Sequence, residues 1–138
     1  MSSVPVTIDA SVFVNAFTPV EPGSDQSLAF IERMKQDGTP LIMPTLLLPE
    51  IAAAVARRHG KVALALQLSD TIRELPNLTL IPLDENLARL SAETAAKYKL
   101  RGSDAVYAAV AIRFGAQLVT LDREQLERLG EAVSAREP

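Results

Sequence analysis

Short apolar segments alternate with helical segments along the chain, and this alternation limits the folds that it can adopt. The runs that predict buried strands are residues 4–8, 40–43, 78–81 and 117–121, with a last edge strand at 132–134. The segments that predict helices are 11–17, 25–37, 46–59, 61–75, 84–97, 103–114 and 123–129. Continuous apolar strands separated by helices are typical of a parallel sheet that is covered on both faces. We therefore expect a three-layer α/β/α fold with a short, mostly parallel central sheet.

Several expected helix ends carry the residues that usually cap them. Asp25 and Asp84 stand at expected helix starts, where a carboxylate can accept hydrogen bonds from free backbone N–H groups. Gly38, Gly60 and Gly115 follow expected helix ends, where glycine adopts the left-handed conformation at low cost. These signals support the boundaries given above.

The size of the chain predicts one domain. With 138 residues, two separate cores would each be marginal, so we expect a single domain over 1–134 and a polar tail over 135–138. The chain has no cysteine, which excludes disulfides, thiolate nucleophiles and zinc–thiolate sites. No apolar run approaches the ~20 residues that span a bilayer, and no signal peptide is visible. The sequence therefore predicts a cytoplasmic protein with no membrane partner.

Four acidic residues interrupt or border apolar runs, where an unpartnered carboxylate is costly. Asp9 and Asp122 follow expected strands, so both should lie at the edge of the sheet where ligands collect. Glu50 lies a turn into the helix after the second strand, and Asp104 begins an otherwise apolar helix. We therefore expect the four carboxylates to meet at one edge.

Each acid also has a purely structural interpretation. Asp9 could simply end a strand, and Asp104 could be a first-turn acid that the helix dipole favours. Asp122 could be an N-cap, with Gln125 completing a capping box. Glu50 is the hardest to explain in this way, because apolar residues flank it on both sides.

Taken together, the four acids favour a metal site. Carboxylates that converge on one edge repel each other unless cations lie between them, and Mg²⁺ and Mn²⁺ prefer such oxygen ligands. These ions can activate water and neutralise charge at a phosphate that is being cleaved. The single histidine, His59, precedes a glycine and is better read as a helix end than as a base.

The net charge of −3 argues against a dedicated nucleic-acid binder, whose domain would normally be basic. Bound cations would offset the charge of an acidic cluster, so the total is a poor guide here. Local basic groups remain available for phosphate contacts. The candidate RNA-binding residues are Arg57, Arg58, Lys61 and Arg101.

The sequence resembles PIN-domain nucleases, and especially the VapC-like toxins of type II toxin–antitoxin systems. The segments that carry the resemblance are 8–15, 48–51, 100–109 and 118–122, and the likeness extends from residue 4 to about residue 128. The resemblance implies that the catalytic, metal-binding acids are Asp9, Glu50, Asp104 and Asp122. It also implies supporting roles beside the metal or water for Ser11 and Thr120.

The family resemblance further implies a function. It implies an endoribonuclease that depends on Mg²⁺ or Mn²⁺, hydrolyses phosphodiester bonds of RNA, and acts as the toxin of a toxin–antitoxin pair. The protein would form a homodimer and would be bound by a cognate antitoxin protein.

Other functions remain open at this point. A non-catalytic PIN-like binding or scaffold module would have the same fold. An Asp-dependent phosphatase would need a second acid two residues after Asp9, where Ser11 stands. A response-regulator receiver would need an acidic pair after the first strand, which the sequence lacks.

Overall fold

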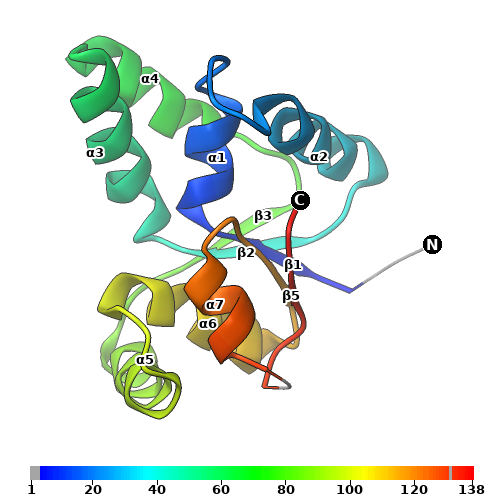
Figure 1. Cartoon of the computed structure of the whole chain (residues 1–138), viewed down its shortest axis with the longest axis vertical. Helices are drawn as coiled ribbons and strands as arrows, with labels where there is room; N and C mark the ends of the chain where they lie inside the picture. Colours follow the sequence, from blue (N-terminus) through cyan, green and yellow to red (C-terminus); the bar gives the residue numbers. More distant parts are fainter. Residues whose placement is uncertain (1–3, 131) are drawn as a thin grey trace.

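A computed structural model describes residues 4–130 and 132–138, and five parallel strands form one sheet within them (Figure 1). The strands are β1 (Val6–Ile8), β2 (Leu41–Pro44), β3 (Leu78–Ile81), β4 (Gln117–Val119) and β5 (Ala135–Arg136). Their order in the sheet is β3-β2-β1-β4-β5, and every neighbouring pair is parallel. Because β1 lies at the centre, the residue that follows it is surrounded by the ends of its neighbours.

Helices cover both faces of this sheet. In Figure 1, one layer above the sheet contains α1 (Ala10–Ala16), α2 (Ser24–Asp37), α3 (Leu47–His59) and α4 (Val62–Arg73). The layer below contains α5 (Glu85–Tyr98), α6 (Gly102–Phe114) and α7 (Arg123–Arg128). The prediction of a three-layer α/β/α fold with a parallel sheet is confirmed.

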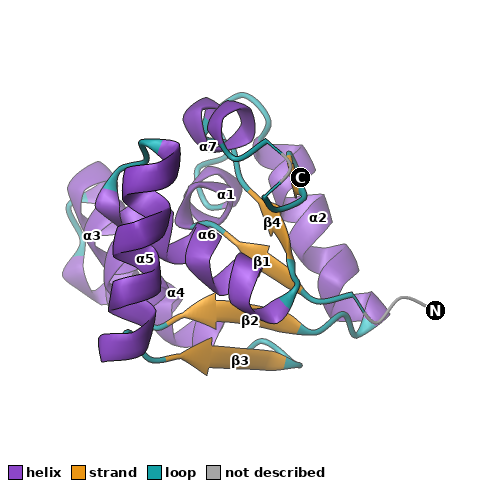
Figure 2. Ribbon diagram, turned by 90° about the horizontal axis from the view of Figure 1, so that it is seen from below, coloured by secondary structure: helices purple, strands orange, loops and turns teal. Residues whose placement is uncertain are grey.

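Helix α6 contains a long buried segment and anchors the lower layer. It runs against β1, β2 and β4, and Figure 2 shows it in front of the sheet, next to α5. Every residue from Asp104 to Ala111 is buried, and most are alanine or valine, so the helix axis can approach the sheet closely. This packing fixes the first turn of α6, and with it Asp104, against the ends of the central strands.

The boundaries differ from the predicted ones at a few positions. Helix α2 begins at Ser24 after Gly23, whose φ of 82° is left-handed, so the prediction that Asp25 caps this helix is wrong. Asp84 does cap α5, where its Oδ1 accepts the Leu87 N–H at 2.8 Å. The predicted strand at 132–134 is also wrong, because β5 comprises Ala135–Arg136 inside the expected tail. This short edge strand needs only backbone hydrogen bonds to β4, so it carries no apolar signal in the sequence.

The described helices include none that is long and apolar enough to cross a membrane.

Candidate active site

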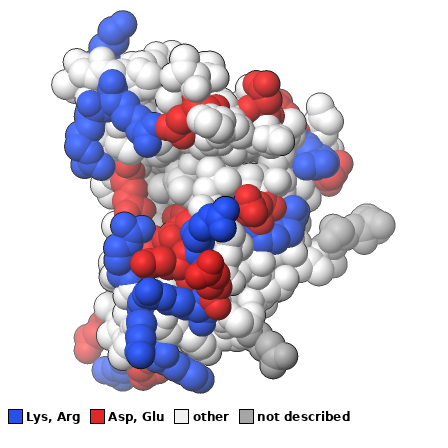
Figure 3. Space-filling view, in the orientation of Figure 1, with Lys and Arg blue, Asp and Glu red and all other residues white. Residues whose placement is uncertain are grey.

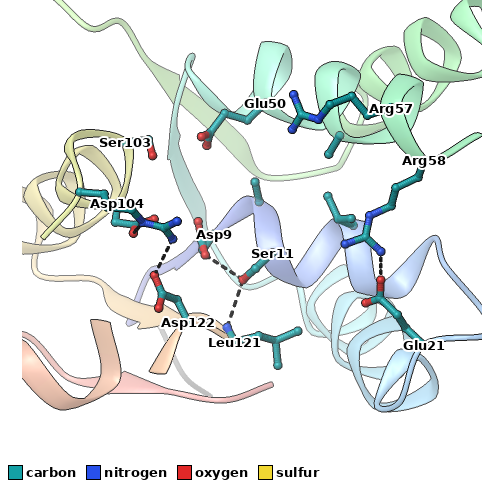
Figure 4. A pocket seen from close by; sticks show the side chains of 14 residues that line it. Asp9, Ser11, Glu21, Glu50, Arg57, Arg58, Ser103, Asp104, Leu121 and Asp122 are labelled. Carbon is teal, nitrogen blue, oxygen red and sulfur yellow. Dashed lines mark hydrogen bonds and ion pairs between the residues drawn. The ribbon is translucent and has the colours of Figure 1, made fainter. Parts of the chain in front are cut away.

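A pocket of about 500 Å³ opens where the carboxyl ends of β1 and β4 meet the starts of α1, α3, α6 and α7. We call it the acidic pocket. The residues that line it are Asp9, Ala10, Ser11, Val14, Glu21, Glu50, Ala54, Arg57, Arg58, Arg101, Ser103, Asp104, Leu121 and Asp122. Figure 4 shows the carboxylates of Asp9, Glu50, Asp104 and Asp122 directed into it. In Figure 3, acidic side chains gather on this face of the molecule with basic side chains around them.

Asp9 is the most deeply held of the four acids. It follows β1 as the N-cap of α1, and only 5% of the residue is exposed. Its Oδ2 accepts hydrogen bonds from the Ser11 hydroxyl at 2.7 Å, the Thr120 hydroxyl at 2.9 Å and Gln125 Nε2 at 3.4 Å. Burial raises the pKa of Asp9, and the hydroxyl donors oppose this only in part. These donors are neutral, so they orient the Asp9 carboxylate without cancelling its charge.

Asp104 and Asp122 form a pair that Arg101 bridges. Arg101 Nε donates to Asp104 Oδ2 at 2.9 Å, and Nη2 donates to Asp122 Oδ2 at 3.2 Å. Asp122 also caps α7, because its Oδ1 accepts the Glu124 N–H at 3.0 Å. Both oxygens of Asp122 are therefore occupied.

The pKa values of the two carboxyl groups in this pair shift in opposite directions. Burial, and then the hydrogen bond with Asp122, raises the pKa of Asp104 to about 7. Partial burial would raise the pKa of Asp122 as well, but hydrogen bonds from Asp104, the Glu124 N–H and Arg101 bring it below its usual value. The more buried partner thus holds a proton that the less buried partner accepts.

Glu50 enters the pocket from the first turn of α3 and is tied to α6. Tyr107 donates its hydroxyl to Glu50 Oε1 at 2.5 Å, and Ser103 provides a further hydrogen bond. Burial raises the pKa of Glu50, and the Tyr107 hydrogen bond opposes this shift. The same burial, together with the charge of Glu50, raises the pKa of Tyr107, so its hydroxyl remains a donor at ordinary pH.

The basic side of the pocket lies further along α3. Glu50, Ala54, Arg57 and Arg58 all line the pocket, so they share one face of this helix. Arg58 forms a close ion pair with Glu21 (Figure 4). Glu21 also accepts a hydrogen bond from Asn15 Nδ2 at 2.9 Å. Arg57 is exposed and makes no ion pair within the described residues.

The structure brings together most of the residues that the sequence singled out. All four acids, Ser11, Arg57, Arg58 and Arg101 line the acidic pocket. Thr120 is buried beneath it and donates to Asp9, whereas Lys61 is exposed and outside the lining.

The structure places further residues at the site that the sequence analysis did not predict, and it contradicts the prediction for Gln125. Tyr107, Ser103 and Glu21 were not expected at the site; for Tyr107 the signal was its position three residues after Asp104 on a buried helix. Gln125 completes no capping box. It is fully buried, and its Nε2 donates to Asp9 and Thr120, while the Asp122 N–H is bound by the Thr120 hydroxyl at 3.0 Å.

The pocket contains the type of ligand atom that a hard divalent cation prefers. Four carboxylates supply the oxygen ligands that Mg²⁺ and Mn²⁺ prefer, and Asp9 has no cationic partner among its hydrogen-bond donors. Within the described residues, however, no three acidic or histidine side chains lie close enough together to hold an ion as they stand. Arg101 is bound to Asp104 and Asp122, so these two carboxylates must part from it and rotate toward the other acids before they share a cation.

Several solved structures have a fold similar to that of this chain. The VapBC2 structure from Rickettsia felis matches with a TM-score of 0.73 and 14% identity over 97% of this chain and 98% of that chain. VapC20 from Mycobacterium tuberculosis, a sarcin–ricin loop cleaving toxin, matches with a TM-score of 0.69 and 16% identity over 86% and 90%. FitAcB from Neisseria gonorrhoeae matches with a TM-score of 0.66 and 18% identity over 96% and 97%. At these identities the likeness establishes the fold.

The sequence itself carries the signature of one family. No curated protein matches it by sequence similarity. A family model of the PIN domain, in contrast, matches residues 6–132, a span that includes all six elements around the pocket, from β1 to α7. The chain therefore belongs to the PIN domain family.

Proposed function

We propose that this protein is a metal-dependent endoribonuclease that hydrolyses phosphodiester bonds of RNA, and that it is the toxin of a toxin–antitoxin pair. The observation that carries the proposal is the convergence of Asp9, Glu50, Asp104 and Asp122 on one open pocket in a PIN fold. Four carboxylates in one pocket are costly for a protein that only needs a stable core. They are useful where divalent cations and a phosphate must meet.

In this proposal the four acids hold Mg²⁺ or Mn²⁺, and a bound ion supplies a polarised phosphate and an activated water. Ser11 and Thr120 orient the Asp9 carboxylate by hydrogen bonds to Oδ2. Tyr107, on α6, orients Glu50 by donating a hydrogen bond to its Oε1. These neutral donors fix the ligands without competing for their charge.

The basic groups of the pocket are suited to hold the RNA backbone. Arg57 lines the pocket on the helix that carries Glu50, and its guanidinium is not engaged by a described carboxylate. Phosphate contacts of this kind position a strand without reading its sequence. We assign Arg57 to the RNA backbone, with Arg101 as a second contact.

The assignment as a toxin is supported by the structural neighbours. VapC20 is a sarcin–ricin loop cleaving toxin, and another structure with a similar fold is a toxin–antitoxin complex from Klebsiella pneumoniae. In the proposed function this chain acts in the cytoplasm as a homodimer and is bound by an antitoxin.

The test is an RNA cleavage assay on the purified chain with Mg²⁺ or Mn²⁺, with and without EDTA. Asp9→Asn should lower the cleavage rate by more than about a hundredfold, because it removes the charge of a ligand and not merely a neighbour of one. Asp84→Asn is the matched control, since Asp84 also follows a strand and caps a helix but lies outside the pocket. Cleavage that continues in EDTA, or that is equal in the two variants, would contradict the metal mechanism. RNA binding without cleavage by any form would instead favour the non-catalytic module.

A further inference from the structure

Arg101 occupies an unusual place in the acidic pocket. It precedes α6 and reaches back over the first turn of that helix, where its guanidinium binds both Asp104 and Asp122. Its own side chain is 71% exposed, whereas those of Asp104 and Asp122 are 9% and 16% exposed. An exposed guanidinium thus covers two carboxylates that are largely shielded from water.

The contacts of Arg101 use the same oxygens that a divalent cation needs. Asp122 Oδ1 is committed to the cap of α7, which leaves Oδ2 as the ligand atom that can be freed, and Arg101 binds it. At Asp104 the guanidinium likewise binds Oδ2. Asp9, by contrast, is held only by neutral donors, which need not leave when a cation arrives. One group in the pocket therefore stands in direct competition with a metal ion.

We propose that Arg101 is a built-in counter-ion of the acidic pocket, which a divalent cation must displace from Asp104 and Asp122. This inference rests on the proposed metal-dependent function. Without metal, the guanidinium stabilises the two inward carboxylates and keeps the four acids from converging. With metal, the ion takes over their charge, and the released guanidinium is free to contact a phosphate of the RNA.

The displacement is feasible because little holds Arg101 besides these two hydrogen bonds. Ion pairs of an exposed side chain are worth little net free energy, since water and salt screen them. Arg101 therefore tunes the metal affinity over a modest range and does not close the pocket permanently. Its effect should also fade as the salt concentration rises.

The experiment is calorimetric titration of Mn²⁺ into the purified full chain, together with thermal melts in the presence and absence of Mn²⁺. Arg101→Gln should bind Mn²⁺ roughly five- to tenfold more tightly than the wild type at low salt, and the gap should narrow at high salt. Without metal the same variant should melt lower than the wild type, because the two carboxylates have lost their counter-ion. A purely structural arginine would lower the melting temperature without tightening metal binding.

Arg113→Gln is the matched control. Arg113 belongs to the same helix and carries the same charge, but it packs over Phe114 outside the pocket. The Arg113→Gln substitution should change the Mn²⁺ affinity by less than about twofold, and this change measures the effect of net charge alone. Arg101→Lys keeps the charge but loses the forked donor, so its affinity should fall between wild type and Arg101→Gln. It serves as the test if the glutamine variant does not fold.

The outcomes separate this inference from the proposed function. If Arg101→Gln binds Mn²⁺ no more tightly than wild type and Arg113→Gln, the counter-ion role is overturned and the metal site stands. If Arg101→Lys, measured in its place, binds as the wild type does, the conclusion is the same. A wild-type chain that binds no Mn²⁺ overturns the metal mechanism and the counter-ion together.

Discussion

Replacing Asp104 by Asn separates the charge of this side chain from its shape. Asn has nearly the same size, and its oxygen can still accept a hydrogen bond from Arg101. Asp104 is not the N-cap of α6, because Arg101 holds that position, so the exchange does not disturb a helix cap. Any change in stability or metal affinity therefore reports on the carboxylate charge.

The magnitude follows from the pKa of Asp104. A rise from 3.8 to about 7 is about 3 pKa units, which corresponds to about 4 kcal/mol against the ionised form in the folded state. That rise already includes the hydrogen bonds with Arg101 and Asp122, but Asp104 lines an open pocket, so water screens part of the cost of its charge. We expect a net gain of about 1–2 kcal/mol at pH 8 without metal, or a melting temperature about 3–8 °C higher.

The pH dependence has a definite sign. Between pH 3.8 and about 7, folded wild type keeps a proton on Asp104 that the unfolded chain releases. The free energy of unfolding must therefore fall as pH rises through this window. Asp104→Asn should remove this fall, so that the two proteins are about equally stable near pH 4 and diverge toward pH 8.

The assay is a series of thermal melts from pH 4 to pH 8, with and without Mn²⁺, and with Asp84→Asn as the control. If Asp104 is a metal ligand, the stabilisation that Mn²⁺ adds should shrink by at least about 1.4 kcal/mol, which is a tenfold loss of affinity at saturating ion. A variant that melts no higher than wild type at pH 8 would refute the electrostatic reasoning. A variant that gains the full stabilisation from Mn²⁺ would refute the ligand role.

Three further predictions concern the neighbours of the acids. Arg57→Gln should weaken RNA binding and lower its salt slope by about one. Arg58→Gln should change RNA binding less, because Glu21 already neutralises Arg58, and its melting temperature should stay close to that of the wild type, because an exposed ion pair contributes little. Filter binding at several salt concentrations and thermal melts will separate the two. Tyr107→Phe should cost about 1–2 kcal/mol in urea unfolding and weaken Mn²⁺ binding, since Glu50 loses its hydroxyl donor; unchanged metal affinity would argue against Glu50 as a ligand. Thr120→Val should cost about 1–3 kcal/mol in the same assay, because buried groups of Asp9 and Asp122 lose their partner, and Thr120→Ser should restore most of it.

The fold could be predicted because its signals are local. The strands β1 to β4 are short, mostly apolar runs that alternate with helices, and this alternation predicts parallel strands regardless of which strands pair. The start of α5 was equally readable, since Asp84 caps it through a contact three residues away. The edge strand β5 was misplaced because only its backbone pairs with β4.

The site could be predicted only in part, because its contacts join distant residues. The four acids stand out by their apolar surroundings, which sequence reveals. Tyr107 and Glu50 are 57 residues apart, and Gln125 and Asp9 are 116 residues apart, so their pairing depends on how α6 and α7 dock. The local pattern even misled at Gln125, where a capping-box spacing was satisfied in sequence while the side chain turned inward to Asp9.

Helix α3 sets the spacing between Glu50 and the basic side chain of Arg57. Glu50 and Arg57 are seven residues apart on one continuous helix, which fixes their separation at about 10 Å along its axis. In the proposed function, the bond that is cut lies at a set distance from the phosphate that Arg57 holds, and no loop movement can change it. Insertion of four alanines after Ala54 would nearly restore the helical face while adding about 6 Å, so the cleavage position would shift along the strand. In the proposed function, the length of helix between Glu50 and Arg57 would thus determine how far the cleaved bond lies from the phosphate that Arg57 contacts.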